Sequence, residues 1–188
     1  MLENKDYDGI KSTIDNAMKA GSERDLGHDY IPSLEMRLEE SARITVKTPW
    51  DVINDITDGG LGAGELGVVV APAGIGKSWT LQALGSEVVR QGKTVVHYSL
   101  ELNENYVGLR YDSIFSGVTT GNIKYHKEDV EKKLQSLPGK LLIKYFPTKA
   151  ASVNTIGSHL KQIELSGVTV DMVIVDYADI LMPTGNFK

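Results

Sequence analysis

The stretch that decides the fold of this chain reads Ala71-Pro72-Ala73-Gly74-Ile75-Gly76-Lys77-Ser78, and Trp79 follows it. The apolar run Val68-Val69-Val70 comes directly before it, and apolar residues at helical spacing come after it. A glycine-rich turn that ends in Gly-Lys-Ser, between a strand and a helix, is typical of a P-loop. The sequence therefore predicts a phosphate-binding loop between a strand over residues 68–70 and a helix over residues 79–91.

Each part of this motif has a chemical reason. Glycines let consecutive backbone N–H groups turn inward around phosphate oxygens, and the following helix adds the positive end of its dipole. Lys77 is expected to reach the β- and γ-phosphates, and the Ser78 hydroxyl to bind Mg2+. Ala71 stands where the strict motif has glycine, which removes some backbone freedom. Residues 71–79 are thus the predicted site for ATP with Mg2+; a chance Gly-Lys-Ser turn is the alternative.

An acid at the end of a later strand is the predicted second anchor for the metal. Asp176 ends the apolar run over residues 172–175. Ligands of open α/β sheets bind where the carboxyl ends of the strands lie, and a carboxylate there can hold the water shell of Mg2+. The alternative is an aspartate that merely ends a strand.

A third acid, Glu101, follows the apolar run over residues 95–100. A carboxylate near the γ-phosphate can orient or deprotonate the attacking water, so Glu101 is the predicted catalytic base beside Lys77. Glu104 is a competing candidate, and an exposed loop acid without a role is the other alternative. His97, inside the run, is expected to be a packed core residue.

The order of the expected elements predicts the fold class. Strands over residues 94–99, 141–145 and 172–176 alternate with helices over residues 79–91, 105–115, 127–137 and 153–165. This alternation favours right-handed crossovers and a mostly parallel sheet with helices on both faces. The chain is therefore predicted to be an α/β P-loop domain.

Composition excludes several other classes. The chain has 188 residues, 41% of them apolar, a net charge of -5 and no cysteine, so disulfides, thiolate catalysis and cysteine-based zinc sites are ruled out. The four histidines do not cluster, and no run approaches the roughly 18 apolar residues of a membrane span. The N-terminus lacks the pattern of a signal peptide, so a soluble, cytoplasmic protein without a membrane partner is expected. The net charge neither indicates nor excludes a nucleic-acid partner.

The first residues of the chain differ in pattern from the rest. Apolar positions predict a helix over residues 8–20 and a short one over residues 33–42. These are either two surface helices of the same domain or an element that docks on a neighbouring subunit.

Several blocks around the P-loop resemble the RecA-like motor of DnaB-type replicative DNA helicases, superfamily four. Before the loop they are Thr48-Pro49-Trp50-Asp51-Val52-Ile53-Asn54, Gly59-Gly60-Leu61 and Gly64-Glu65-Leu66. After it, Ser99-Leu100-Glu101-Leu102 with Arg110 resembles the second motif of the family, and Val175-Asp176-Tyr177 resembles its Walker-B block. The turn Phe146-Pro147-Thr148 is similar to that in the helicases of large tailed phages. The resemblance covers residues 48–182.

The resemblance implies a RecA-like P-loop NTPase core over residues 48–188, here incomplete, and a short helical linker over residues 1–47. It implies that Lys77 and Ser78 hold phosphate and Mg2+, that Glu101 activates water and that Asp176 supports the metal. ATP hydrolysis would then drive translocation on single-stranded DNA and unwinding of the duplex. Members of the family form hexameric rings with ATP between subunits and an arginine finger from the neighbour. Primase and a helicase loader are further implied partners, and a phage protein would act in the host cytoplasm.

Two departures from the family pattern shape the expectation. The later sensor, DNA-contacting loops and arginine finger are not located before Lys188, and Asp179 stands where bacterial members often have glutamine. We therefore expect a segment of a helicase that alone binds nucleotide poorly and unwinds nothing. The alternatives are a RecA-like recombinase or clock-type ATPase, and a nucleotide-binding interaction module that does not hydrolyse ATP.

Overall fold

The computed structural model describes residues 9–11, 13–14, 29–35 and 43–183, and the chain forms two compact units, Met1–Ala42 and Arg43–Lys188. In the first unit residues 9–11, 13–14 and 34–35 are helical. Most other residues of the two helices predicted there lie outside the described residues. The second unit contains the P-loop.

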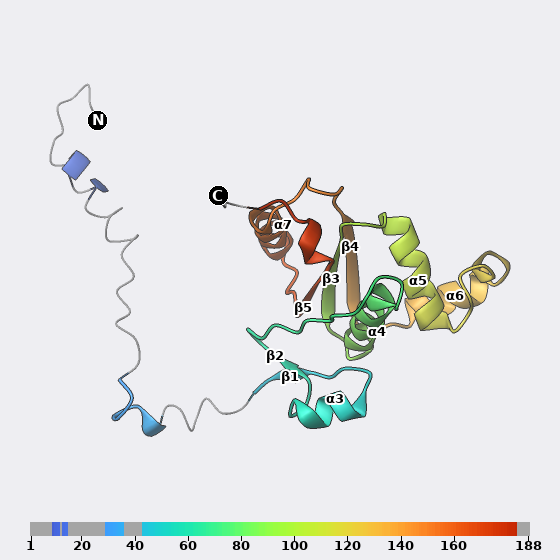
Figure 1. Ribbon diagram of the computed structural model, residues 1–188, viewed down its shortest axis with the longest axis horizontal. Helices are drawn as coiled ribbons and strands as arrows, with labels where there is room; N and C mark the ends of the chain where they lie inside the picture. Colours follow the sequence, from blue (N-terminus) through green and yellow to red (C-terminus); the bar gives the residue numbers. More distant parts are fainter. Residues whose placement is uncertain (1–8, 12, 15–28, 36–42, 184–188) are drawn as a thin grey trace. The chain divides into compact units, whose positions relative to one another are not determined.

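A parallel sheet of three strands, in the order β4-β3-β5, forms the centre of the second unit (Figure 1). The central strand β3 (Thr94–Ser99) pairs with β4 (Lys140–Tyr145) on one side and with β5 (Met172–Asp176) on the other. β3 is almost wholly buried because its β-branched and aromatic side chains meet helices on both faces. Its register places Ser99 beside Asp176, so the carboxyl ends of β3 and β5 are adjacent.

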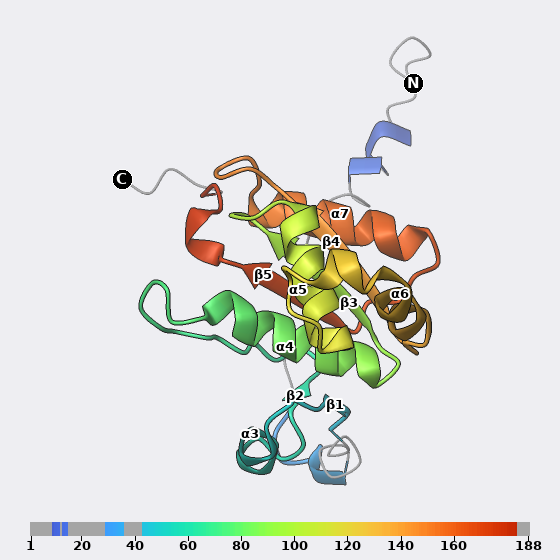
Figure 2. The same ribbon diagram turned by 90° about the vertical axis from the view of Figure 1, so that its right-hand side faces the viewer.

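Helices cover both faces of the sheet, as Figures 1 and 2 show. On one face lie α4 (Lys77–Arg90) and α5 (Glu104–Ser116), with α6 (Lys127–Gln135) packed against α5. On the other face lies α7 (Val153–Leu165). Two short 3₁₀ helices, η2 (Ile123–Tyr125) and η3 (Ala178–Ile180), precede α6 and follow β5.

Two apolar clusters, one on each face of the sheet, hold these layers together. Val89 of α4 clusters with Val95 and Met172, and Ile156 of α7 clusters with Tyr98 on the opposite face. Side chains on a strand alternate between faces, so β3 supplies both clusters. The α/β fold predicted from the alternation of strands and helices is confirmed.

A smaller antiparallel pair precedes the P-loop. It consists of β1 (Thr45–Val46) and β2 (Leu61–Gly62), with α3 (Asp51–Ile56) between them. Arg43 Nε donates to Glu65 Oε1 at 2.7 Å, and this hydrogen bond lowers the pKa of Glu65 to about 2. Gln91, just after α4, exchanges two 3.0 Å hydrogen bonds with the backbone of Lys47. The two bonds of Gln91 join the antiparallel pair to the end of α4.

The prediction of a strand over residues 68–70 is wrong. These residues are not assigned to a strand, and Val68 and Val70 are 72% and 88% exposed. A strand needs a neighbour to pair its backbone groups, and within residues 43–183 the sheet on this side ends at β5. The apolar β-branched run is present, but no described strand pairs with it.

Candidate nucleotide-binding site

The loop before α4 has the backbone that a P-loop requires. Gly74 and Gly76 have φ of 79° and 106°, a region that residues with a Cβ rarely adopt. A Cβ at either position would meet no atom within 4 Å, so the backbone angle and not crowding requires glycine. Gly76 is the N-cap of α4, and the positive end of the helix dipole therefore opens into the loop.

The Lys77 ammonium lies over this loop. Its Nζ donates to the carbonyl oxygens of Ala71 at 2.7 Å and Pro72 at 3.2 Å. Within the described part of the chain Lys77 pairs with no carboxylate. A phosphate oxygen offers this ammonium a stronger, charge-assisted bond than either neutral carbonyl.

Ser78 lies at the carboxyl edge of the sheet. α4 ends at Arg90, close to the start of β3 at Thr94, so the two elements run in opposite directions. A helix of 14 residues spans about 21 Å, roughly the length of β3, and the start of α4 therefore reaches the end of the strands. The Ser78 hydroxyl makes no hydrogen bond with a described residue.

Asp176 is the acid at that edge, and it is only 4% exposed. Its backbone oxygen accepts the Leu100 N–H at 2.8 Å, which fixes the end of β5 against the end of β3. Its carboxylate has no hydrogen bond or ion pair with a described residue. Mg2+ in nucleotide sites typically takes one or two protein oxygens and completes its shell with phosphates and water. Ser78 and Asp176 supply oxygens of that kind.

The structure distinguishes the two competing glutamates. Glu104 begins α5, accepts the Tyr145 N–H at 3.0 Å and lies 3.8 Å from Lys144 Nζ, so it is bound to the end of β4. Glu101 is exposed just beyond β3 and has no partner among the described residues. Within residues 43–183, Glu101 is therefore free of protein partners at the carboxyl edge, whereas Glu104 is engaged by the end of β4. His97 is fully buried, as expected for a core residue.

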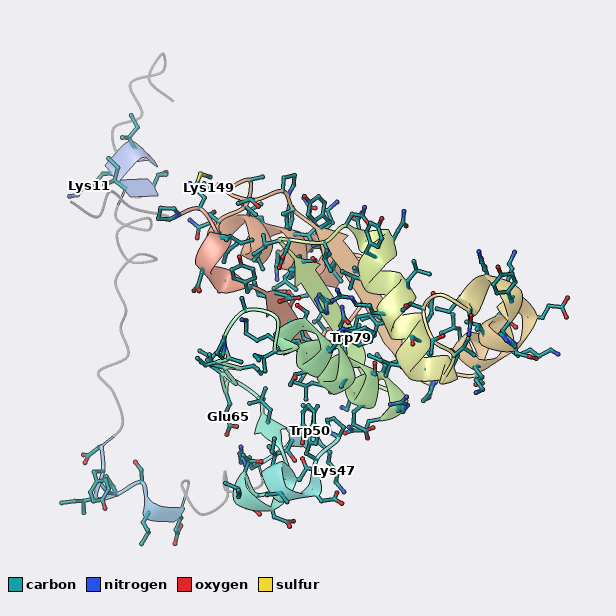
Figure 3. The ribbon with its side chains drawn as sticks, turned by 45° about the vertical axis from the view of Figure 1, so that its right-hand side comes forward. Lys11, Lys47, Trp50, Glu65, Trp79 and Lys149 are labelled. Carbon is teal, nitrogen blue, oxygen red and sulfur yellow. The ribbon has the colours of Figure 1, made fainter. Side chains whose placement is uncertain are left out.

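Trp79 and Arg110 form a contact next to the P-loop that the sequence did not indicate. Trp79 lies between α4 and α5 (Figure 3), and the Arg110 guanidinium carbon is 5.2 Å from its ring centroid. This distance is that of a cation–π interaction. The contact connects the first turn of α4 to α5.

An open groove with a volume of about 750 Å³ lies beside the first turn of α4 and was also not predicted. Trp50, at the start of α3 and labelled in Figure 3, is one of the residues that line it. Thr80 of α4 is another. Apolar side chains at positions 49, 50, 52 and 53 were visible in the sequence, but nothing there placed them against α4.

The sheet, the helices on its two faces and the loop before α4 have the RecA-like fold of P-loop domains. Two solved structures share this fold. One, "The Structure Of A DnaB-Like Replicative Helicase And Its Interactions With Primase", matches with a TM-score of 0.64 and 19% identity over 100% of this chain and 47% of that one. The other was solved as an ATPase domain, and it matches with a TM-score of 0.61 and 15% identity over 84% of this chain and 58% of that one.

Within that class the chain is similar to the DnaB-like replicative helicase of Enterobacteria phage T4. The two sequences are 30% identical over 186 residues, which cover 93% of this chain and 39% of the phage T4 protein. The chain thus spans about two fifths of the length of this curated relative. No family model matches the sequence. The resemblance to DnaB-type replicative helicases, including those of phages, is confirmed.

Proposed function

We propose that this chain is an ATP-binding and ATP-hydrolysing segment of a replicative DNA helicase. Residues 48–188 form the first part of its RecA-like domain, and residues 1–47 form a linker. The observation that carries the proposal is the convergence of a glycine-shaped P-loop, Glu101 and Asp176 at one edge of the sheet. The similarity to the phage T4 helicase supports it.

The residues of this site have distinct roles in the proposed reaction. The backbone N–H groups of residues 71–78 and the Lys77 ammonium bind the β- and γ-phosphates. The Ser78 hydroxyl and the Asp176 carboxylate hold Mg2+, which when bound neutralises charge that develops on the phosphate oxygens. Glu101 accepts a proton from the water that attacks the γ-phosphorus, and this attack breaks the bond to the leaving ADP oxygen. Trp79, in the first turn of α4, is the last residue of the proposed nucleotide-binding segment.

The partners follow from the same proposal. The assembled helicase is a homo-oligomeric, hexameric ring on single-stranded DNA, with ATP between subunits and an arginine finger from the neighbour. Primase and a helicase loader are its protein partners, and it works in the cytoplasm, that of the host if it is encoded by a phage. The similarity to a helicase solved for its interactions with primase supports the first of these protein partners. Among the described residues no helix has the length and apolarity to cross a membrane.

Substitution of Glu101 tests the hydrolytic role. In the complete helicase, Glu101→Gln is expected to retain ATP binding and to lower DNA-stimulated turnover by about 100- to 10,000-fold, since a general base contributes that much. Glu104→Gln is the matched control, because Glu104 is engaged by Tyr145 and Lys144 and should leave turnover near that of the wild type. Turnover and equilibrium nucleotide binding are measured side by side. Unchanged turnover in Glu101→Gln would favour a module that binds nucleotide without hydrolysing it.

A further inference from the structure

Trp79 is a large apolar side chain in an exposed position of the first turn of α4. Its side chain is 43% exposed, and it belongs to neither of the two apolar clusters that hold the sheet and its helices together. Tryptophan is highly buried on average in folded proteins. Core packing therefore does not explain an indole at this position.

Arg110 holds this ring in place without covering it completely. Its guanidinium carbon lies 5.2 Å from the ring centroid, and the ring lies between α4 and α5 (Figure 3). Arg110 takes part in none of the ion pairs formed by the described residues. The indole is thus fixed by a cation on α5, and part of its surface stays open to solvent.

A second contact of the same kind shows that joining α4 to α5 does not require an exposed ring. At the other end of these helices the Arg90 guanidinium carbon lies 5.4 Å from the ring centroid of Phe115, and Arg90 Nη2 donates to the Ile114 carbonyl at 3.0 Å. Phe115 packs against the apolar cluster that contains Val89. The aromatic ring far from the P-loop therefore packs on the core, whereas the ring beside the P-loop does not.

The position of Trp79 next to the phosphate loop indicates a ligand. In the proposed site the backbone of residues 71–78 surrounds the phosphates, so the base of the nucleotide lies outside the loop. Trp79 is the first side chain after Ser78. A base that stacks on an aromatic side chain contributes about 5- to 150-fold to affinity, because both partners are flat and apolar on their faces.

We propose that Trp79 stacks on the base of the bound nucleotide and gives the site a preference for purines over pyrimidines. This inference rests on the proposed function, in which the P-loop binds a triphosphate. A purine has two fused rings and covers more of the indole than the single ring of a pyrimidine, so more apolar surface leaves water.

The test compares three ligands by calorimetry on the complete protein with Mg2+: a non-hydrolysable ATP analogue, its uridine counterpart and inorganic tripolyphosphate. The wild type is expected to bind the ATP analogue more tightly than the uridine one. Trp79→Ala should weaken binding of the ATP analogue by about 5- to 150-fold and remove most of this preference. Its affinity for tripolyphosphate, which has no base, should stay unchanged. Trp79→Phe keeps a flat ring and should retain most of the affinity.

Two variants serve as matched controls. Arg90→Met removes the equivalent contact between α4 and α5 at the end away from the P-loop. Trp50→Ala removes the other tryptophan of the chain, which is 36% exposed and lines the groove beside α4. Both variants are expected to bind all three ligands like the wild type.

Fluorine NMR of protein that contains 5-fluorotryptophan gives a second readout on the wild type. Its two resonances, from Trp50 and Trp79, are assigned with Trp50→Phe. The ATP analogue should shift the Trp79 resonance further than tripolyphosphate does and leave the Trp50 resonance in place. A base-dependent shift of Trp50 alone would place the base in the groove, and the role assigned to Trp79 would be wrong.

The outcomes separate the two proposals. If the wild type binds neither the ATP analogue nor tripolyphosphate, the proposed function itself fails. If the wild type binds the analogue but Trp79→Ala binds it equally well, or loses tripolyphosphate to the same degree, Trp79 does not stack on the base. Should Trp79→Ala fail to fold, the fluorine resonances of the wild type decide the matter.

Discussion

His97 and Tyr98 are neighbours in β3, and their side chains enter opposite faces of the sheet. Each makes one hydrogen bond between a tyrosine hydroxyl and a histidine Nδ1. Their surroundings differ, because His97 is completely enclosed while His159, the partner of Tyr98, is only half-buried. Enclosure lowers the pKa of His97 from 6.5 to about 4, since a buried imidazolium loses its hydration.

This lowered pKa predicts that the folded state loses stability in acid. Between about pH 6.5 and pH 4 the unfolded chain binds a proton at His97 that the folded chain does not, so stability is full above this window and falls as the pH falls through it. The loss approaches about 3 kcal/mol, from roughly 1.4 kcal/mol per pKa unit. Urea unfolding of the wild type and of His97→Asn, measured at several pH values, isolates the contribution. If the free energy of unfolding falls equally with pH in both proteins across this window, His97 is not the cause of the acid sensitivity.

At the scale of single elements, α4 illustrates how packing overrides helix propensity. Gly85 lies inside this helix, where alanine would ordinarily be preferred. The space for a Cβ is already taken by the Tyr111 hydroxyl and Ile174 Cδ1. Gly108 lies inside α5, and a Cβ there would meet no atom within 4 Å.

The two glycines are therefore expected to respond to alanine with opposite signs. Gly85→Ala should destabilise the fold by about 1–3 kcal/mol through overpacking, and Gly108→Ala should stabilise it by about 0.5–1 kcal/mol through helix propensity. Midpoints of urea unfolding compare both variants with the wild type. A stabilising Gly85→Ala would mean that α4 can shift away from Tyr111 without cost.

The elements also show which features a sequence can reveal. β5 and α7 occupy the residues predicted for them, because β-branched runs and helical spacing are local signals. The run over residues 68–70 has the same composition as a strand but lacks a pairing neighbour, which no local signal reveals. β1, β2 and α3 were missed because two strands of two residues carry almost no periodicity.

The candidate site likewise has parts that a local sequence signal reveals and parts that it does not. The P-loop was predictable because its chemistry lies in consecutive residues. The choice between Glu101 and Glu104 depended on Tyr145 and Lys144, some 40 residues further along the chain. The hydrogen bond between His97 and Tyr111 joins β3 to α5, and no local sequence signal pairs these two residues.

At the scale of the second unit, a short run of strongly exposed apolar side chains precedes the P-loop. Leu66, Val68 and Val70 are each more than 70% exposed, and their backbone has no sheet partner among the described residues. An uncharged, β-branched segment with free backbone groups is a template for pairing with another chain.

This surface predicts that a single charge will improve solubility. Val68→Lys is expected to lower the aggregation rate at raised concentration and to leave the unfolding midpoint unchanged, because the side chain packs on little. Val153→Lys is the control, since Val153 is 64% exposed but belongs to the helix α7 and not to the segment before the P-loop. Light scattering over time provides the measurement. An equal effect of both substitutions would attribute the gain to net charge and not to the segment.

The contact between Trp79 and Arg110 has an optical consequence. The chain has only two tryptophans: Trp79 lies in the first turn of α4, and Trp50 lines the groove beside that helix (Figure 3). The indole that immediately follows Ser78 emits light whose wavelength depends on the cation above it and on nearby charge. Replacement of Trp50 by phenylalanine leaves Trp79 as the one tryptophan, directly after the P-loop, so the unlabelled protein can report by its tryptophan fluorescence when a triphosphate arrives.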